Sequence, residues 1–466
     1  MANVSSAGIG SGLDVNSIVT QLMAIERQPL TALETKATKI QSTVSEYGKI
    51  KSAVSALRDL ASKLASSTTW AQTTAAASNS AVTATTNANA IPGAYTVEVQ
   101  TLASAQTLAT GVQPATATVG AGTLHIELGT WGTGQTTFTP KTGAAAVDVA
   151  IAATDTLSDV RDKINASGAG VTAMIMTDAT GSRLLMRSSA TGADGGFRTS
   201  GVAPLSFDPS AGVTTMTQTQ TAANAAATVN GLAVSSASNT LGNVVDGLTL
   251  TLTAVTTAPV NVNVATDAAA IKKTITDFAA AYSAVIKLIA TDTKYDPVGK
   301  TGGMLQGDSA ATGLQRQLRT LTGSTSAASA LFPHLSDLGL QVQADGSLTV
   351  NGTVLDNALN NVAELKKAFS NSDVLDPTKD GFGKRFRVIA DSLLGVDGSL
   401  TTRTDGLAKQ LQRNQKDQDA LNARLDGIEK RMRAQYTALD TVMAQLNGQS
   451  SYITQQLAAF NNSSNS

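Results

Sequence analysis

His125 and His334 are the only imidazoles of this chain, and cysteine is absent. Disulfides, thiolate metal sites and cysteine nucleophiles are therefore excluded, and any bound metal would need oxygen ligands. His125 alternates with Glu127 in an apolar run, which puts both side chains on one face of a predicted strand, where such a pair could serve as acid and base. No G-x-S-x-G elbow occurs with either histidine. We therefore expect a solvated strand face here and no catalytic residue, metal or cofactor.

Two glycine-containing segments resemble phosphate-binding motifs. The run GIGSGLD (residues 8–14) lacks the third glycine of a dinucleotide fingerprint, because that position is Leu13, and no strand precedes it. The triplet Gly299–Thr301 resembles the end of a phosphate loop, but Lys294 stands where the loop's first glycine is required. We therefore expect no nucleotide binding at residues 8–14, and we interpret Gly299–Thr301 as an ordinary exposed loop.

Charge and composition exclude further classes of function. The chain carries 34 basic and 35 acidic residues with only 4% aromatics, which argues against nucleic acid as a partner. The basic cluster at Lys430, Arg431 and Arg433 adjoins Asp426 and Glu429, as on a mixed-charge helix flank. Long uncharged stretches are rich in Ser, Thr and Ala, so we expect no membrane span. The N-terminus lacks the parts of a Sec signal, which leaves the cytosol or export without a cleavable signal.

The middle of the chain differs from its flanks. Residues 71–265 hold 16 charged residues in 195, about 8%, against 15% for the whole chain. Apolar residues alternate with polar ones, as in LTLTL (residues 248–252), which predicts half-buried strands. Turn pairs at Asn230-Gly231 and Thr180-Gly181 predict hairpins, and residues 156–166 show helical spacing. The middle is therefore predicted to be β-rich with one helix.

Both flanks have helical period. From Leu33 to Leu64 the apolar residues follow steps of three and four, with an extra three-residue step from Tyr47 to Ile50 that predicts a stammer. From Leu407 to Leu446 a similar ladder predicts a second coiled-coil-like helix. Helical segments and a hairpin turning at Asp345-Gly346 are expected between them.

The predicted fold class is α+β, with a stalk of N- and C-terminal amphipathic helices and β-rich head subdomains inserted between them, because each apolar stripe needs a partner to cover it. Both ends pack side by side in this layout. The expected domains are residues 1–38 (N-terminal helix segment), 39–70 (stalk helix), 71–106 with 221–265 (first head subdomain), 107–220 (second head subdomain), 266–439 (helical leg domain with a hairpin) and 440–466 (C-terminal helix segment).

The two terminal segments are candidate sites of assembly. Asp14 is a predicted N-cap, and an apolar face follows it up to Pro29. Such apolar stripes belong either to a core within the subunit or to surfaces that bind other subunits. If they bind other subunits, both end segments should be mobile in the isolated subunit. The predicted contact residues are Gly8, Gly10, Gly12, Leu13, Asp14, Ile18, Leu22, Ile25, Leu439, Met443, Leu446, Ile453 and Leu457.

Polar residues interrupt the C-terminal ladder at Asn414, Gln418 and Gln435. Single polar residues in an apolar seam can fix register at some loss of stability. These three residues are therefore predicted to set the oligomer's register. Gln418→Leu is expected to raise helix stability and to give mixed oligomers.

The opening run SSAGIGSGLDV (residues 5–15), followed by IVTQLM (18–23), resembles the start of the flagellar filament cap proteins, also called hook-associated protein 2 or FliD. Further segments follow in that family's order, although the resemblance is weakest over residues 106–222: GAYTVEV (93–99), VNG (229–231), GLTLTL (247–252), LQGD (305–308), LGLQV (338–342), QYTALD (435–440) and SYITQQL (451–457).

The resemblance implies a structural cap at the distal end of the bacterial flagellar filament, which holds the tip and promotes folding and polymerisation of exported flagellin. It implies a ring-shaped homo-oligomer, with flagellin, hook-filament junction proteins and a cytoplasmic export chaperone as partners. It also implies secretion through the flagellar type III apparatus to the filament tip. The alternative from another class is a secreted adhesin that binds host glycans through the Thr-rich head. Loss of the gene separates the two, since only a cap mutant would leak monomeric flagellin.

Overall fold

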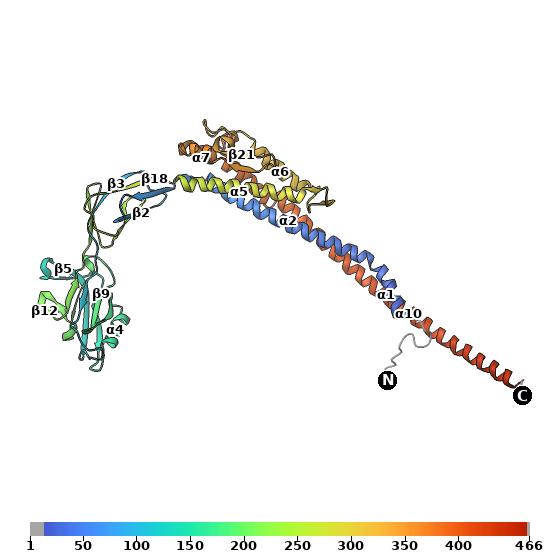
Figure 1. The fold of residues 1–466 in the computed structure, drawn as a ribbon, viewed down its shortest axis with the longest axis horizontal. Helices are drawn as coiled ribbons and strands as arrows, with labels where there is room; N and C mark the ends of the chain where they lie inside the picture. Colours follow the sequence, from blue (N-terminus) through green and yellow to red (C-terminus); the bar gives the residue numbers. More distant parts are fainter. Residues whose placement is uncertain (1–13, 464–466) are drawn as a thin grey trace. The chain divides into compact units, whose positions relative to one another are not determined.

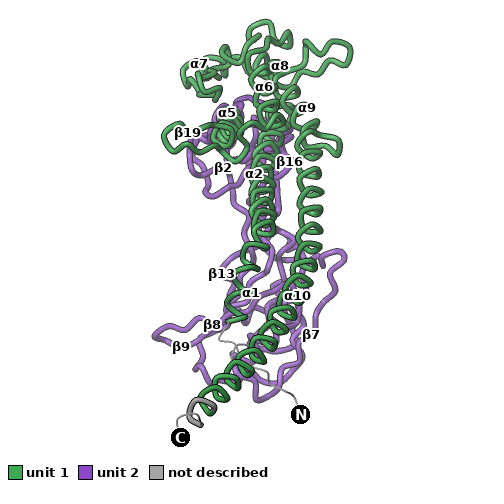
Figure 2. The backbone as a smooth tube through the Cα atoms, turned by 90° about the vertical axis from the view of Figure 1, so that its right-hand side faces the viewer, with its two compact units in different colours: residues 1–70, 272–466 green, residues 71–271 purple. Residues whose placement is uncertain are grey.

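The structure, a computed structural model, describes residues 14–463 and divides the chain into two compact units. Unit 1 consists of residues 1–70 and 272–466, and unit 2 of residues 71–271 (Figure 2). The chain therefore leaves the first unit once and returns to it. This arrangement matches the predicted α+β class, with helical flanks around a β-rich insert.

Unit 1 is mostly helical (Figure 1). Its helices are α1 (Val15–Glu26), α2 (Gln28–Ala65), α3 (Ser67–Trp70), α5 (Ala268–Thr293), α6 (Ser309–Thr322), α7 (Gly352–Leu359), α8 (Val362–Ser370), α9 (Phe382–Leu394) and α10 (Ser399–Ser463). Two small hairpins join them: β19 (Tyr295–Asp296) with β20 (Thr301–Gly302), and β21 (Leu340–Val342) with β22 (Leu348–Val350).

Helix α2 packs along α9 and along the first half of α10. After Leu30, its buried residues lie on one stripe, at positions 40, 43, 47, 50, 54, 57, 61 and 64. This stripe alternates three- and four-residue steps without interruption, because Thr43 is buried and Val44 is only half-buried. The predicted stammer is therefore wrong: a threonine holds a seam position that an apolar pattern assigns to its neighbour.

Helix α5 passes through the core of the helical unit. Its fully buried side chains include Phe278 and Tyr282, whose rings meet Phe386 of α9 edge-on at centroid distances of 5.0 and 5.8 Å. By length and composition alone, α5 is the one described helix that could cross a membrane. Its apolar face is covered by the other helices of the unit, as in a core helix.

Unit 2 contains two hydrophobic cores. The first lies between a five-stranded antiparallel sheet and a three-stranded one. The larger sheet has the order β1 (Thr73–Ala77), β18 (Val260–Thr266), β3 (Gly93–Thr101), β14 (Ala225–Val229), β15 (Leu232–Ser236), and the smaller β16 (Thr240–Val245), β17 (Leu248–Leu252), β2 (Val82–Thr86). Asn230 and Gly231 both have positive φ at the β14–β15 turn, as a tight hairpin requires.

The second core of unit 2 involves residues between Leu108 and Met216. One sheet has the order β12 (Val213–Thr214), β11 (Phe207–Asp208), β10 (Gly196–Ser200), β5 (Gly122–Trp131), β6 (Phe138–Pro140), with β7 (Val147–Ile151) also paired to β5. The other has the order β13 (Thr217–Gln220), β4 (Thr107–Ala109), β9 (Gly181–Ser188), β8 (Val171–Asp178). The predicted helix is α4 (Leu157–Ala166). Thr156 and Asp159 form a reciprocal capping box at its N-terminus.

Candidate functional site

The helix that opens the described chain is positioned by local signals and by one apolar face. Asp14 caps α1 by accepting a hydrogen bond from the Ser17 amide at 3.0 Å, and Pro29 lies in the first turn of α2. Val15, Val19 and Met23 are buried. They form a small core with Leu30 and Leu425, against which lie the half-buried side chains of Leu421, Ile428, Met432 and Tyr436.

The two long terminal helices lie side by side as predicted, because α2 packs along α10. Helix α1 packs on residues 421–436 of α10. Ile25 is 62% exposed, while Ile18 and Leu22 are half-buried. Gly8, Gly10, Gly12 and Leu13 lie outside the described residues.

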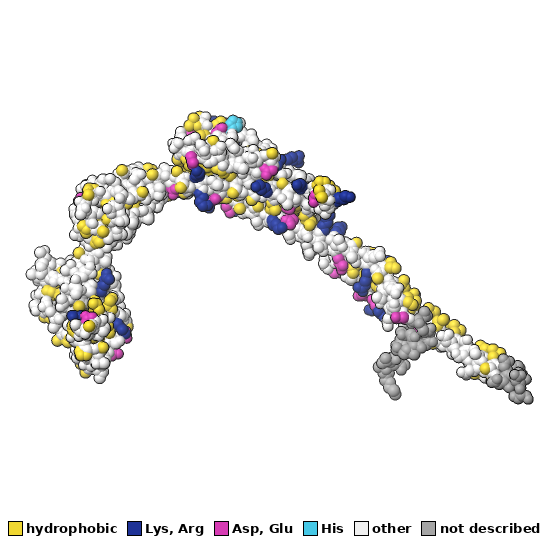
Figure 3. Space-filling view, in the orientation of Figure 1, with side chains coloured by type: hydrophobic (Ala, Val, Ile, Leu, Met, Phe, Trp, Pro, Cys, Tyr) yellow, Lys and Arg dark blue, Asp and Glu magenta, His cyan; other side chains and the backbone are white. Residues whose placement is uncertain are grey.

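Beyond α1, the apolar ladder of α10 continues without a partner among residues 14–463. We call this part the C-terminal stripe: Leu439, Val442, Met443, Leu446, Ile453 and Leu457. Met443 is half-buried, and the exposed fractions of the other five range from 46% at Leu439 to 60% at Leu457. Figure 3 shows hydrophobic side chains gathered along this end of the helix. An apolar row of this length on a water-exposed helix is typical of a surface that binds another helix.

The three polar residues of the ladder have different surroundings. Asn414 is buried at 3% exposure, and its Oδ1 accepts a hydrogen bond of 2.6 Å from Nε2 of the half-buried Gln418. The Nδ2 group of Asn414 has no hydrogen-bond partner among the described residues. Gln435 is exposed. Gln418→Leu would leave the whole Asn414 amide unpaired, so the expected gain in stability requires replacing both residues.

A buried polar contact joins three helices of unit 1. Asp308 caps α6 by accepting hydrogen bonds from the amides of Ala310 and Ala311 at 2.9 and 3.3 Å. The same carboxylate accepts a 2.6 Å bond from the Tyr47 hydroxyl of α2, and bonds of 2.7 and 3.1 Å from Nη2 and Nε of Arg403 in α10. We call Tyr47, Asp308 and Arg403 the helix tie.

The electrostatics of the tie favour a charged Asp308. Burial raises the pKa of Asp308, but the hydrogen bonds from Tyr47, Arg403 and the Ala311 amide outweigh it and bring the pKa below its ordinary value. Burial, together with the carboxylate, raises the pKa of Tyr47, which keeps its hydroxyl protonated as a donor. The sequence points to Asp308 only through the LQGD motif, and nothing in the spacing predicts its partners, which lie 261 and 95 residues away.

The residues singled out for chemistry do not form a reactive site in the described part of the chain. His125 contacts Asp148 on the neighbouring strand β7, and both are about half-exposed. Glu127 lies on the same strand as His125 but pairs with Arg198, at 2.6 Å. No group of three or more acidic or histidine side chains that could hold a metal occurs among residues 14–463.

The other motifs likewise have structural roles. Gly299–Thr301 forms part of the β19–β20 turn, with Lys300 at a positive φ of 49°. His334 contacts Asp337 at 3.2 Å across a short 3₁₀ turn. In the basic cluster, Arg433 pairs with Glu429 at 2.9 Å and reaches Asn16 of α1 at 2.9 Å. The mixed-charge flank therefore helps to hold α1 on α10.

Comparison with known proteins gives matches over the whole chain. Family models described as the N- and C-terminal parts of flagellar hook-associated protein 2 match residues 11–106 and 222–448. Flagellar hook-associated protein 2 of Escherichia coli strain K12 is 32% identical over 484 aligned residues, with complete coverage of both chains. The chain belongs to the flagellar hook-associated protein 2 family.

Further matches support membership of the hook-associated protein 2 family. A model described as the flagellin hook IN motif matches residues 132–190, within unit 2. The B-type flagellar hook-associated protein 2 of Pseudomonas aeruginosa is 30% identical, with 88% of each chain covered. The crystal structure of the D1-D2-D3 domains of the flagellar cap protein FliD from Escherichia coli superimposes with a TM-score of 0.59 at 29% identity, covering 78% of this chain and 99% of that one. The adhesin alternative receives no support from these matches.

Proposed function

We propose that this chain is the structural cap at the distal end of the bacterial flagellar filament, where it holds the tip and promotes folding and polymerisation of exported flagellin. The proposal is supported by the full-length match to hook-associated protein 2 and by the likeness to the crystal structure of the flagellar cap protein FliD from Escherichia coli. In this role the chain works by contact between helices, without covalent chemistry.

The observation that carries the proposal is the C-terminal stripe, which no other described helix covers. Helix α2 covers the first part of the apolar ladder of α10, and α1 covers residues 421–436. The ladder continues beyond residue 436 of α10 with exposed leucine and isoleucine side chains. A further helix laid on this row would continue the same seam. We assign this position to flagellin at the filament end, since filament contact is what a cap requires.

The wider setting follows from the proposed role. The chain would assemble into a ring-shaped homo-oligomer and meet flagellin and the hook-filament junction proteins at the growing tip. It would reach that place outside the cell through the flagellar type III apparatus, with a cytoplasmic chaperone holding it before export. Absence of cysteine suits this route, because no disulfide can keep the chain folded before export.

Complementation of a deletion strain tests the function. Bacteria without the gene are expected to release monomeric flagellin into the medium and to make no long filaments, and the wild-type gene should reverse both effects. The double variant Leu446→Asp/Ile453→Asp should be exported but fail to restore filaments, because two carboxylates would have to be buried in the seam.

The matched control places the same charges away from the stripe. Gln445 and Gln455 are exposed residues of the same helical segment, so Gln445→Asp/Gln455→Asp should support normal filaments. Full filaments in the deletion strain would overturn the cap function. Full filaments with Leu446→Asp/Ile453→Asp would remove the stripe from the mechanism.

A further inference from the structure

Asp292 is a buried carboxyl group that the proposed function does not use. It lies in the last turn of α5 and is 9% exposed. Among residues 14–463, it is the one acidic side chain with a fully buried oxygen, Oδ2, that has no hydrogen-bond partner. Burying a charged group without donors is costly, because nothing replaces the water that the group loses. The neutral, protonated form of Asp292 avoids this cost.

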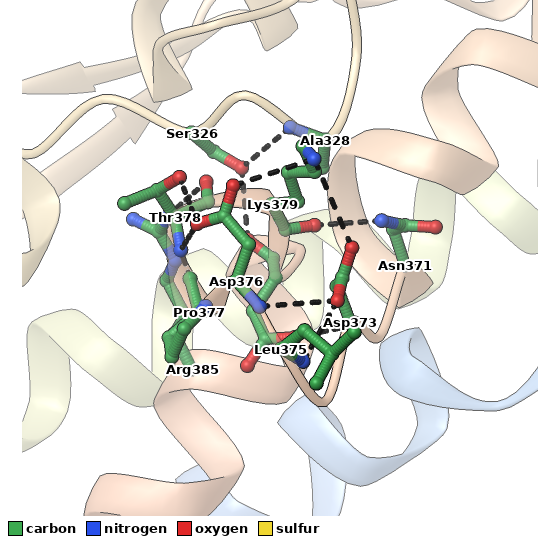
Figure 4. Close-up of polar contacts among 11 residues, drawn as sticks. Ser326, Ala328, Asn371, Asp373, Leu375, Asp376, Pro377, Thr378, Lys379 and Arg385 are labelled. Atoms are coloured by element: carbon green, nitrogen blue, oxygen red, sulfur yellow. Dashed lines mark hydrogen bonds and ion pairs between the residues drawn. The ribbon is translucent and has the colours of Figure 1, made fainter.

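Other aspartates of unit 1 receive the donors that Asp292 lacks. In the loop between α8 and α9, Asp373 accepts hydrogen bonds from the amides of Leu375 and Asp376 at 2.9 and 3.1 Å (Figure 4). The carboxylate of Asp376 lies 3.4 Å from Lys379 Nζ (Figure 4). Such donors favour the charged form of a carboxyl group. Without them, the surroundings of Asp292 favour the neutral form.

The charges around Asp292 also oppose its ionisation. The last turn of a helix carries partial negative charge from its free carbonyl groups, so a carboxylate there is unfavourable. On the facing helix α2, Glu46 and Lys49 are the charged groups close to Asp292, and Lys49 Nζ is already bound to Glu46 at 2.8 Å. Burial first, and then the charge of Glu46, raise the pKa of Asp292 above its ordinary value, while Lys49 offsets part of this.

Residues 303–306 close over the end of α5 and bring no titratable side chain to it. The Leu305 amide donates to the Asp292 carbonyl at 2.8 Å. A Cβ at Gly303 would lie 2.2 Å from the same carbonyl oxygen, so the two backbones are in direct contact. With Lys39 and neighbouring residues of α2, this segment lines a cavity of about 670 Å³. Any change at the end of α5 therefore acts on one wall of this cavity.

We infer that Asp292 is a proton-operated latch, which holds residues 303–306 closed when it is neutral and releases them when it is ionised. Opening lets water reach the buried charge and widens the cavity beside Lys39. Because the folded pKa lies above the unfolded value of about 3.9, the stabilisation is fully present below that pH and is lost as the pH rises through the folded pKa. The inference concerns unit 1 alone and does not rest on the cap function.

Amide exchange in the full-length chain tests the latch locally. Relative to its intrinsic rate, the Leu305 amide should exchange about tenfold faster at pH 7 than at pH 4.5. Asp292→Asn should remove this difference. The matched control is Asp296→Asn, which changes an exposed aspartate of the β19–β20 hairpin and should keep the difference. Equal protection of Leu305 at both pH values in the wild type would overturn the inference.

The stability of unit 1 gives a second measurement. In a Trp131→Phe background, Trp70 fluorescence follows the unfolding of unit 1 in urea. Asp292→Asn should raise the urea midpoint at pH 7 by about 0.5 M, because no buried charge remains, and this gain should shrink as the pH falls to 4.5. A midpoint at pH 7 no higher than that of Asp296→Asn would refute the latch.

A third variant tests the neighbouring charge. Glu46→Gln removes the negative charge beside Asp292 and frees Lys49, so Asp292 should ionise more easily. The pH at which the Leu305 amide loses protection should therefore move to a lower value. A transition at an unchanged or higher pH would contradict the assignment of this transition to Asp292.

Discussion

Replacing Asp308 by alanine should destabilise unit 1 more than any surface substitution, because this carboxylate caps α6 and binds two other helices at once. Loss of the cap costs about 1 kcal/mol. The fully buried Tyr47 would be left with an unpaired hydroxyl, which costs about 1–3 kcal/mol. The Arg403 side chain is 39% exposed, so water can replace much of its ion pair with Asp308. Loss of this ion pair should cost roughly 0.5–1 kcal/mol of stability.

These contributions together predict a loss of about 3–4 kcal/mol for Asp308→Ala. With a urea m-value of about 3 kcal/mol per molar, the unfolding midpoint of unit 1 should fall by about 1 M. The chain carries one of its two tryptophans in each unit, Trp70 in unit 1 and Trp131 in unit 2. In a Trp131→Phe background, the fluorescence of Trp70 therefore reports on unit 1 alone.

The control is Asp405→Ala, which removes an exposed aspartate from α10 and should change the stability by less than about 0.5 kcal/mol. The variant Asp308→Asn keeps a good N-cap but loses the charge, so it should fall between the two. A midpoint for Asp308→Ala equal to that of Asp405→Ala would refute the reasoning, since it would mean that the tie contributes nothing.

The remaining predictions concern the pH dependence of stability, the second core of unit 2, the polar pair Asn414 and Gln418 of α10, and the two terminal segments. The pKa of Asp308 is lower in the folded chain than in the unfolded chain, where it is about 3.9. The carboxylate therefore stabilises the fold above about pH 3.9, and this stabilisation is lost as the pH falls through the folded pKa. The difference in urea midpoint between wild type and Asp308→Asn should be constant from about pH 5 to 7 and shrink below about pH 4. Gln106→Ala should destabilise the second core of unit 2 by about 3 kcal/mol, because the buried side-chain amide makes hydrogen bonds with both backbone groups of Phe197 and with the Trp131 indole. Unfolding monitored by Trp131 fluorescence measures this loss, and an unchanged midpoint would contradict the prediction. Gln418→Leu alone should lower stability by about 1 kcal/mol, whereas Asn414→Leu/Gln418→Leu should raise stability by about the same amount. The double variant should also give mixed oligomers in light scattering. A single oligomer size would argue against a role of these residues in setting the register. Amide exchange of the monomer should be slower across residues 18–25 than across 439–457, because only the first segment has a buried face, and equal rates would count against the C-terminal stripe as a free surface.

Periodic patterns determined the secondary structure of this protein. The two-residue alternation of residues 248–252 became β17, and the Asn230-Gly231 pair became the tight turn before β15. These features depend on neighbours in the chain, because a strand alternates its faces and a turn needs residues that accept positive φ. The family resemblance likewise depends on local segments, and the comparisons confirm it.

The tertiary structure decided which helices meet and which side chains are left without a partner. The same kind of ladder runs through α10 before and after Tyr436, but only the part that faces α2 and α1 is covered, so pattern alone could not separate core from contact surface. Thr43 in the seam and the meeting of Tyr47, Asp308 and Arg403 depend on contacts between distant segments. Burial and hydrogen bonding of such groups are set by what packs across from them, and a single sequence carries no record of that partner.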